Sequence, residues 1–177
     1  MRGWDPRLTG VVARTWPDDW EARKAGGDCE LCAEGRPEVN VFGSRRVWRG
    51  PFADAYLRPE SVPLGYTLVV WRGRHVAEPT ELSDEEATGY WLEVLRVARG
   101  VERRYSPAKL NLQLLGNAVP HLHTHIVPRY VTDPDPRRPP DFVASGGELL
   151  PANDYAREVT ALAELIAGPA RAGDSDR

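Results

Sequence analysis

The most concentrated chemistry in the sequence is a row of three histidines, His121, His123 and His125, spaced one residue apart. The chain has only 4 histidines, so this row holds all but one of them. Residues at i, i+2 and i+4 of a β-strand share a face, which predicts three imidazoles on one side and the intervening residues on the other. A buried row of imidazoles has many ring nitrogens to satisfy. The spacing therefore indicates chemistry rather than a histidine-rich surface strand without function.

Two kinds of chemistry fit this row. An H-x-H pair on a strand can present two ligands to a zinc ion. Alternatively, one imidazole can attack phosphorus while its neighbours hold its tautomer and contact the phosphate oxygens. A hydrolytic zinc site needs a nearby acid or base, and no Asp or Glu occurs between Glu102 and Asp133. The sequence therefore favours nucleophilic catalysis, with a zinc-dependent hydrolase as the alternative.

A second motif is formed by Cys29 and Cys32, the only cysteines of the chain. A C-x-x-C pair can be a redox couple, half of a zinc site or two unrelated thiols. Redox pairs usually open a helix after a strand, whereas this pair follows Gly26-Gly27-Asp28 and precedes a turn expected at 34–35. A zinc site would need two more ligands, and His75 is the only histidine outside the row.

Short strand-like segments separated by Gly- and Pro-containing turns surround this chemistry, as is typical of an antiparallel meander. One long helix interrupts them, because Ser83 and Glu86 form a capping box, apolar residues recur along one face, and Pro107 ends the pattern. The expected strands cover residues 39–42, 46–48, 54–57, 66–71, 110–115 and 121–127, and shorter helices are expected over 20–25 and 154–167.

Length and charge suit one soluble domain, with 177 residues and a net charge of −3. This mild acidity gives no reason to expect a nucleic acid duplex or a membrane as partner. No apolar run reaches the roughly 18–20 residues of a membrane span, and no secretory signal is evident, so we expect a cytoplasmic protein. The expected organisation is an N-terminal extension over 1–28, a catalytic domain over 29–130, a Pro-rich loop and helix over 131–167, and a disordered tail over 168–177.

The segment from Asn111 to Arg129 resembles the signature of the histidine triad (HIT) superfamily, H-φ-H-φ-H-φ-φ, and is most similar to bacterial members with G-N-x-V-P before the row. Gly65–Val70, followed by Arg74 and His75 and then a long helix, is also similar to that family. The resemblance implies an α+β, HIT-like fold with about five antiparallel strands, one long helix packed on them and a short C-terminal helix. It also implies a homodimer.

The resemblance further implies a nucleotide hydrolase or nucleotidyl transferase that acts at an α-phosphate through a covalent nucleotidyl-histidine. His123 matches the attacking histidine, and His125 matches the one that contacts phosphate and supports the leaving group. Asn117 and, less directly, Asn111 match phosphate-binding positions. Dinucleoside polyphosphates or nucleoside phosphoramidates are the implied substrates, and a nucleotide-binding sensor on the same scaffold is the non-enzyme alternative.

HIT proteins that keep the cysteine pair resemble galactose-1-phosphate uridylyltransferase, in which two histidines complete a structural zinc site. By this resemblance the ligands are Cys29, Cys32, His75 and His121, which leaves His123 and His125 for catalysis.

Three positions depart from the family pattern. Arg58, followed by Glu60, stands where many members carry an acid for the ribose hydroxyls, Tyr66 replaces a common His, and Ala118 replaces a Ser or Thr that assists the leaving group. These departures leave the α-phosphate chemistry intact and weaken the case for an adenosine substrate. Most of the 6 tryptophans are expected in the core or at a dimer interface, with one available to stack on a base.

Overall fold

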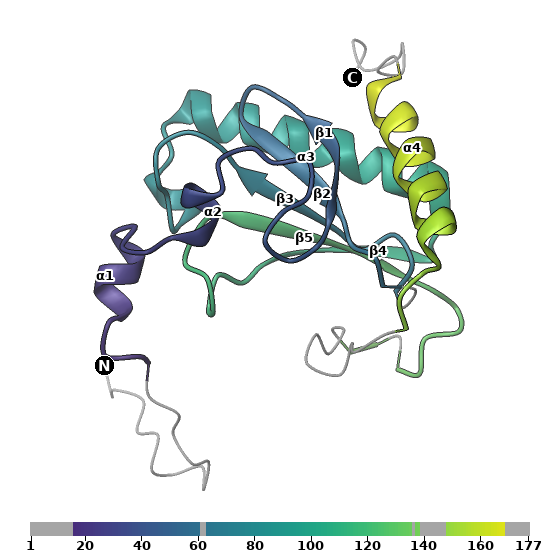
Figure 1. Ribbon diagram of the computed structural model, residues 1–177, viewed down its shortest axis with the longest axis horizontal. Helices are drawn as coiled ribbons and strands as arrows, with labels where there is room; N and C mark the ends of the chain where they lie inside the picture. The colour runs from purple at the N-terminus through teal and green to yellow at the C-terminus, as the bar shows by residue number, and fades with distance from the viewer. Residues whose placement is uncertain (1–15, 61–62, 136, 139–147, 169–177) are drawn as a thin grey trace, which may run out of the picture.

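The computed structural model describes residues 16–60, 63–135, 137–138 and 148–168 (Figure 1). Within these residues a five-stranded antiparallel sheet is combined with one long helix and shorter helices on either side of it in sequence. This arrangement confirms the predicted α+β class and the five-stranded sheet. Apart from Gly168, the expected tail lies outside the described residues, as do residues 1–15 and much of the expected Pro-rich loop.

The sheet consists of β1 (Arg45–Arg49), β2 (Ala53–Leu57), β3 (Thr67–Trp71), β4 (Lys109–Leu114) and β5 (His123–Arg129). The strand order is β1-β2-β3-β5-β4, so the histidine-bearing strand β5 is hydrogen bonded on both edges. His123 is opposite Val70 of β3, while His125 is opposite Leu68 of β3 and Gln113 of β4. Pairing on both edges fixes the register of these histidines.

The helices are α1 (Trp20–Lys24), α2 (Glu30–Ala33), α3 (Asp84–Tyr105) and α4 (Ala152–Ala167), with a 3₁₀ turn at Pro79–Glu81. The predicted capping box starts α3, because the Ser83 hydroxyl accepts from the backbone N–H of Glu86 and the Glu86 carboxylate accepts from that of Ser83. Helix α3 packs on β2, β3 and β5, and α4 packs on α3 and β1. In Figure 1, α1 and α2 lie at the end of the sheet away from α4.

Buried apolar layers cover both faces of the sheet. The layer under α3 joins Val69, Trp71 and Ile126 of the sheet to Tyr90 and Val94 of the helix. Residues that alternate with these along the strands form the second layer, together with one residue of α2: Leu31, Tyr56, Tyr66, Leu68, Val70 and Val127. The short helix α2 therefore covers the face opposite α3.

The strand predicted at 39–42 is wrong. The side-chain Oδ1 of Asn40 accepts hydrogen bonds from the backbone N–H groups of Phe42 and Ser44, at 3.1 and 2.9 Å, and Gly43 has a φ of 75°. An asparagine side chain that takes over backbone hydrogen bonds in this way favours a turn, even beside β-branched residues.

Two boundaries near the site also differ from expectation. Strand β5 begins at His123 rather than His121, because the N–H of Leu122 donates to the carbonyl of Val76, outside the sheet, although its own carbonyl still accepts from Trp71 of β3. The cysteine pair does open a helix, since Cys29 is the N-cap residue of α2. The pair therefore shares the helix start with redox motifs, but it follows α1 rather than a strand.

Candidate functional site

The two histidines of β5, His123 and His125, lie on the face of the sheet opposite α3. Thr124 between them points toward the helix, where its hydroxyl is 2.7 Å from the buried hydroxyl of Tyr90. The rings of His123 and His125 meet edge to face, with centroids 4.8 Å apart. The alternation expected from the sequence spacing is therefore present in β5.

The ring of His123 is held through Nδ1, which lies 2.6 Å from the backbone carbonyl oxygen of His121. A carbonyl oxygen only accepts, so Nδ1 carries the proton and donates it, and Nε2 keeps its lone pair. Burial lowers the pKa of His123 below its usual value, so the ring is neutral at pH 7. The anchoring proton and the nucleophilic lone pair are thus on different nitrogens of one ring.

The ring of His125 contacts Tyr66, whose hydroxyl oxygen is 2.5 Å from Nδ1. Burial and the neighbouring His123 lower the pKa of His125 to about 3, and burial raises that of Tyr66 to about 12, so both are neutral at pH 7. The Arg58 guanidinium lies 5.2 Å from the centroid of the Tyr66 ring, and its Nε donates to Glu60 at 2.9 Å. An ion pair of Arg58 and Glu60 thus lies at the His125 end of the row.

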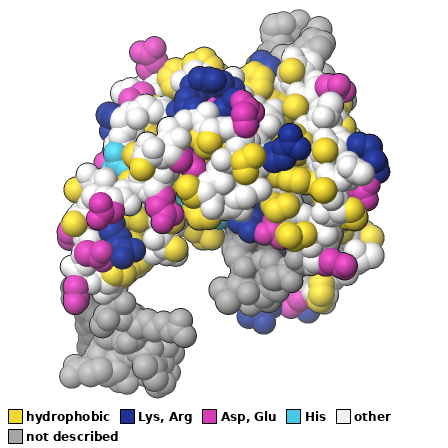
Figure 2. Space-filling model, viewed as in Figure 1, with side chains coloured by type: hydrophobic (Ala, Val, Ile, Leu, Met, Phe, Trp, Pro, Cys, Tyr) yellow, Lys and Arg dark blue, Asp and Glu magenta, His cyan; other side chains and the backbone are white. Residues whose placement is uncertain are grey.

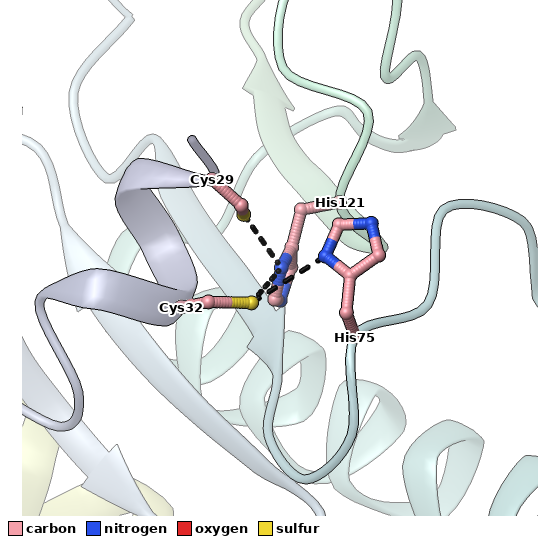
Figure 3. A group of neighbouring side chains, drawn as sticks. All are labelled: Cys29, Cys32, His75 and His121. Atoms are coloured by element: carbon pink, nitrogen blue, oxygen red, sulfur yellow. Dashed lines mark hydrogen bonds between the residues drawn. The ribbon is translucent and has the colours of Figure 1, made fainter. Parts of the chain in front are cut away.

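At the other end of the row, His121 joins a cluster with Cys29, Cys32 and His75 (Figure 3). Nδ1 of His121 is 3.4 Å from Sγ of Cys29 and 3.5 Å from Sγ of Cys32. Nδ1 of His75 is 3.4 Å from Sγ of Cys32. A tetrahedral zinc ion, with Zn–S of about 2.3 Å and Zn–N of about 2.0 Å, would separate sulfur from nitrogen by about 3.5 Å. The donor set and its spacing therefore fit a Cys₂His₂ metal site.

Both histidines of this cluster turn Nδ1 to the thiols because Nε2 is anchored on a backbone carbonyl. Nε2 of His121 is 2.9 Å from the carbonyl oxygen of Trp71, and Nε2 of His75 is 3.0 Å from that of Lys24. Metal-binding histidines commonly donate their second ring N–H in this manner. Gly26 lets the chain pass close to His75, since it has a φ of 93° and a Cβ there would lie 3.0 Å from Cγ of His75.

The thiol of Cys32 is protonated unless a cation is bound, because burial and a hydrogen bond with Cys29 raise its pKa to about 11. The buried Arg72 holds their helix in place by donating to the carbonyl oxygen of Leu31 at 2.8 Å and to the carboxylate of Asp54 at 3.0 Å. Sequence reasoning missed Arg72 and Asp54, since a residue just after β3 and one on β2 leave no local pattern.

The two asparagines predicted to contact phosphate lie in different places. Asn117 is exposed in the loop before β5 and lines the same cavity as His123. Asn111 lies on β4 opposite Val127, and its Oδ1 accepts from Nη1 of Arg129 at 3.0 Å. Of the two, Asn117 is therefore the one beside the nucleophile candidate.

The cavity beside His123 has a volume of about 280 Å³. Its lining comes from segment 16–24, from residues 77–79 and from the stretch 114–123. This volume is near the lower end of the roughly 300–1,000 Å³ typical of small-molecule pockets. A larger hollow of about 500 Å³ lies between α3 and β4, but none of the 4 histidines lines it. Of the two, the smaller cavity is thus the one in which a ligand would contact histidines of the row.

Comparison with known proteins agrees with this geometry. The HIT domain pattern matches residues 50–132. Over 107 residues the chain is 31% identical to Protein hit of Bacillus subtilis, and the match covers 58% of this chain and 69% of that protein. The chain belongs to the HIT family.

Two further likenesses extend this finding. The HIT protein described here is 28% identical over 96 residues to the bis(5'-nucleosyl)-tetraphosphatase (asymmetrical) of Schizosaccharomyces pombe. This match covers 51% of this chain and 52% of that enzyme. A histidine triad protein of Bradyrhizobium japonicum superposes with a TM-score of 0.63 at 24% identity, covering 70% of this chain and 90% of the other. The match thus spans about half of the tetraphosphatase, and the structural likeness shows the HIT fold.

The HIT match contains the complete histidine row but begins after Cys29 and Cys32. No helix in the described part of this HIT protein is long and apolar enough to cross a membrane. Acidic and basic side chains are interspersed over the face shown in Figure 2. That face therefore offers no continuous basic stripe of the kind that binds nucleic acid.

Proposed function

We propose that this HIT protein is a nucleotide hydrolase or nucleotidyl transferase in which Nε2 of His123 attacks an α-phosphate. The observation that carries the proposal is the 2.6 Å contact between Nδ1 of His123 and the carbonyl oxygen of His121. It fixes a neutral ring with its lone pair on Nε2, and a neutral imidazole is a competent nucleophile near pH 7.

In the first step a bond forms between Nε2 of His123 and the α-phosphorus, and the bond from phosphorus to the leaving group breaks. The ring becomes positively charged because Nδ1 keeps its proton, and the carbonyl of His121 stabilises that charge. Water or another acceptor then attacks the same phosphorus, loses its proton to solvent and returns the electron pair to Nε2. Dividing the displacement into two steps lowers each barrier.

His125 has a supporting role in this proposal. The hydroxyl of Tyr66 donates to Nδ1 of His125, which places the ring proton on Nε2. That N–H donates a hydrogen bond to the phosphate or to the leaving-group oxygen as its negative charge grows. Asn117, in the same cavity as His123, is proposed to bind a phosphate oxygen through its side-chain amide, and Asn111 remains a weaker candidate for the same role.

A structural zinc ion is the second part of the proposal, with Cys29, Cys32, His75 and His121 as ligands. When bound it would cross-link α2 to the segments before β5 and after β3, and it supplies rigidity rather than a reacting group. The reading in which zinc sits among the three histidines of the row has less support, because His121 turns to the thiols while His123 is anchored on a carbonyl.

One quenching experiment tests the catalytic proposal. The protein is mixed with labelled nucleotides, stopped in alkaline denaturant to preserve P–N bonds, and digested for mass spectrometry. We expect a nucleoside monophosphate adduct on the His123 peptide, and none in His123→Ala. Turnover that persists in His123→Ala contradicts the proposal. Turnover abolished by a chelator in protein that stays folded favours a catalytic zinc, and binding without turnover favours a sensor.

We also propose a homodimer in the cytosol. Leu95 of α3 and Leu112 of the edge strand β4 line the same hollow and are 39% and 41% exposed, which supports an interface along that edge. A reducing compartment would keep both free thiols available for metal. Light scattering on a sizing column measures the oligomeric state, and a monomeric mass at micromolar concentration contradicts the dimer.

A further inference from the structure

The cavity beside His123 has a wall that the family match does not include. Trp16 and Trp20, together with Lys24, line the cavity from the segment before α2, whereas the match begins at residue 50. We call these three residues the tryptophan wall. They lie far from His123 in sequence but share its cavity.

The two indole rings form an aromatic surface. Their centroids are 4.4 Å apart with an interplanar angle of 31°, and Trp16 is 57% exposed. Large aromatic side chains usually bury most of their surface. An exposed indole at the mouth of a cavity is therefore suited to a planar aromatic ligand, and every nucleobase has a π-face that can stack on it.

The charges around the wall are complementary to the rest of a nucleotide. Lys24 supplies a cation that can meet phosphate oxygens, and the amide of Asn117, which lines the same cavity, supplies further donors. Glu78, which also lines the cavity, offers a carboxylate that accepts hydrogen bonds from ribose hydroxyls. The cavity thus combines a stacking surface, donors for phosphate and an acceptor for sugar.

The wall lies at one end of the row and a second polar group lies at the other. His121 and His123 line the cavity, whereas His125 is in contact with Tyr66, which in turn lies beneath Arg58. The proposed nucleophile is therefore placed between two separate regions able to meet nucleotide groups. A substrate with one nucleoside needs one of them, and a substrate with two nucleosides joined by phosphates can use both.

We propose that the tryptophan wall binds the base of the second nucleoside of a dinucleoside polyphosphate, while the phosphate attacked lies at His123. This assignment rests on the proposed function and chooses between its two substrate classes. The wall is joined to the Cys₂His₂ cluster, because the carbonyl of Lys24 accepts from Nε2 of His75 at 3.0 Å. The Cys₂His₂ cluster therefore positions the tryptophan wall as well as the start of β5.

Binding to an inactive variant tests this assignment without requiring turnover. In a His123→Ala background, titration calorimetry compares diadenosine tetraphosphate with ATP, which has one nucleoside. We expect Trp16→Ala to weaken tetraphosphate binding about tenfold, a loss typical of one base stack, and to change ATP binding less than twofold. Trp20→Phe keeps an aromatic ring and should lose at most about threefold.

Phe42→Ala is the matched control, since Phe42 is an aromatic residue 40% exposed that does not line the cavity. It should leave both affinities unchanged, and circular dichroism confirms that each variant is folded. An equal loss for ATP and the tetraphosphate, or no loss for either, overturns the assignment. The proposed function would be refuted by a wild-type protein that forms no adduct on His123. The binding experiment uses a variant that lacks His123, so its outcome can be told apart from that one.

Discussion

His121 and His123 are two residues apart, yet opposite nitrogens anchor their rings. Nε2 of His121 bonds to the carbonyl of Trp71 and turns Nδ1 to two thiols, whereas Nδ1 of His123 bonds to the carbonyl of His121 and leaves the lone pair on Nε2. The side chains are identical, so the difference comes from the position of the nearest backbone carbonyl. One ring is thereby suited to bind a metal and the other to attack phosphorus.

Removal of the nucleophile should give the largest effect and separate the two regions. His123→Ala is expected to lower turnover by about 10⁴-fold or more, because a group that forms the covalent intermediate has no substitute. The melting temperature and the zinc content should stay close to those of the wild type, since His123 is outside the Cys₂His₂ cluster. Steady-state kinetics and metal analysis measure both quantities, and a loss of zinc in this variant would show that the regions are not separate.

The reciprocal change removes a thiol. Cys32→Ala should lower the zinc content from about one per chain to near zero and reduce the free energy of unfolding by about 4 kcal/mol, as expected when a structural metal is lost. Denaturant unfolding measures the loss, and wild-type protein treated with a chelator should show a similar one. Equal stability of Cys32→Ala and wild type would refute a structural metal.

Tyr66→Phe tests whether the hydrogen-bond partner of His125 also decides which of its ring nitrogens carries the proton. Without the phenol, the proton of His125 is no longer directed to Nε2, and kcat should fall about 10- to 100-fold with a poor leaving group. With a good leaving group such as 4-nitrophenolate the loss should almost vanish, since little charge needs support. The same loss with both leaving groups would indicate that Tyr66 affects structure rather than the leaving group.

The effect that is smallest near neutral pH is a pH dependence of stability. The pKa of His125 is lowered to about 3 in the folded protein, so the unfolded chain binds an extra proton between about pH 3 and pH 6.5. Stability should therefore fall as pH falls through this window, by up to about 1.4 kcal/mol per pH unit for this group. Comparing the slopes of wild type and His125→Gln isolates the contribution, and equal slopes would contradict it.

The sequence predicted the parts of the fold that depend on short patterns. The H-x-H-x-H spacing predicted that His123 and His125 share one face of β5, and the Ser83–Glu86 box predicted the start of α3. Helix α2 was missed because it has only four residues and no apolar repeat of its own. Its position depends on Arg72, whose contacts with Leu31 and Asp54 join segments distant in sequence.

In the candidate site, too, some features could be predicted from the sequence and others could not. The residue types and their spacing predicted which histidines could react, but not which nitrogen of each would be free. For His121 and His123 that choice depends on the carbonyls of Trp71 and His121, and a backbone carbonyl has no sequence signature. The tryptophan wall was also beyond prediction, because nothing in the pattern around Trp16 indicates which strand it faces.

Gly26 shows how a substitution far from any reacting atom could matter. A Cβ there would lie only 3.0 Å from the His75 ring, which would have to shift, and the residue would also need a left-handed backbone. Such a variant would shift one cluster ligand and the neighbouring carbonyl of Lys24 together. In a mutational scan, position 26 should therefore tolerate change as poorly as a cysteine ligand, although glycine itself has no functional group.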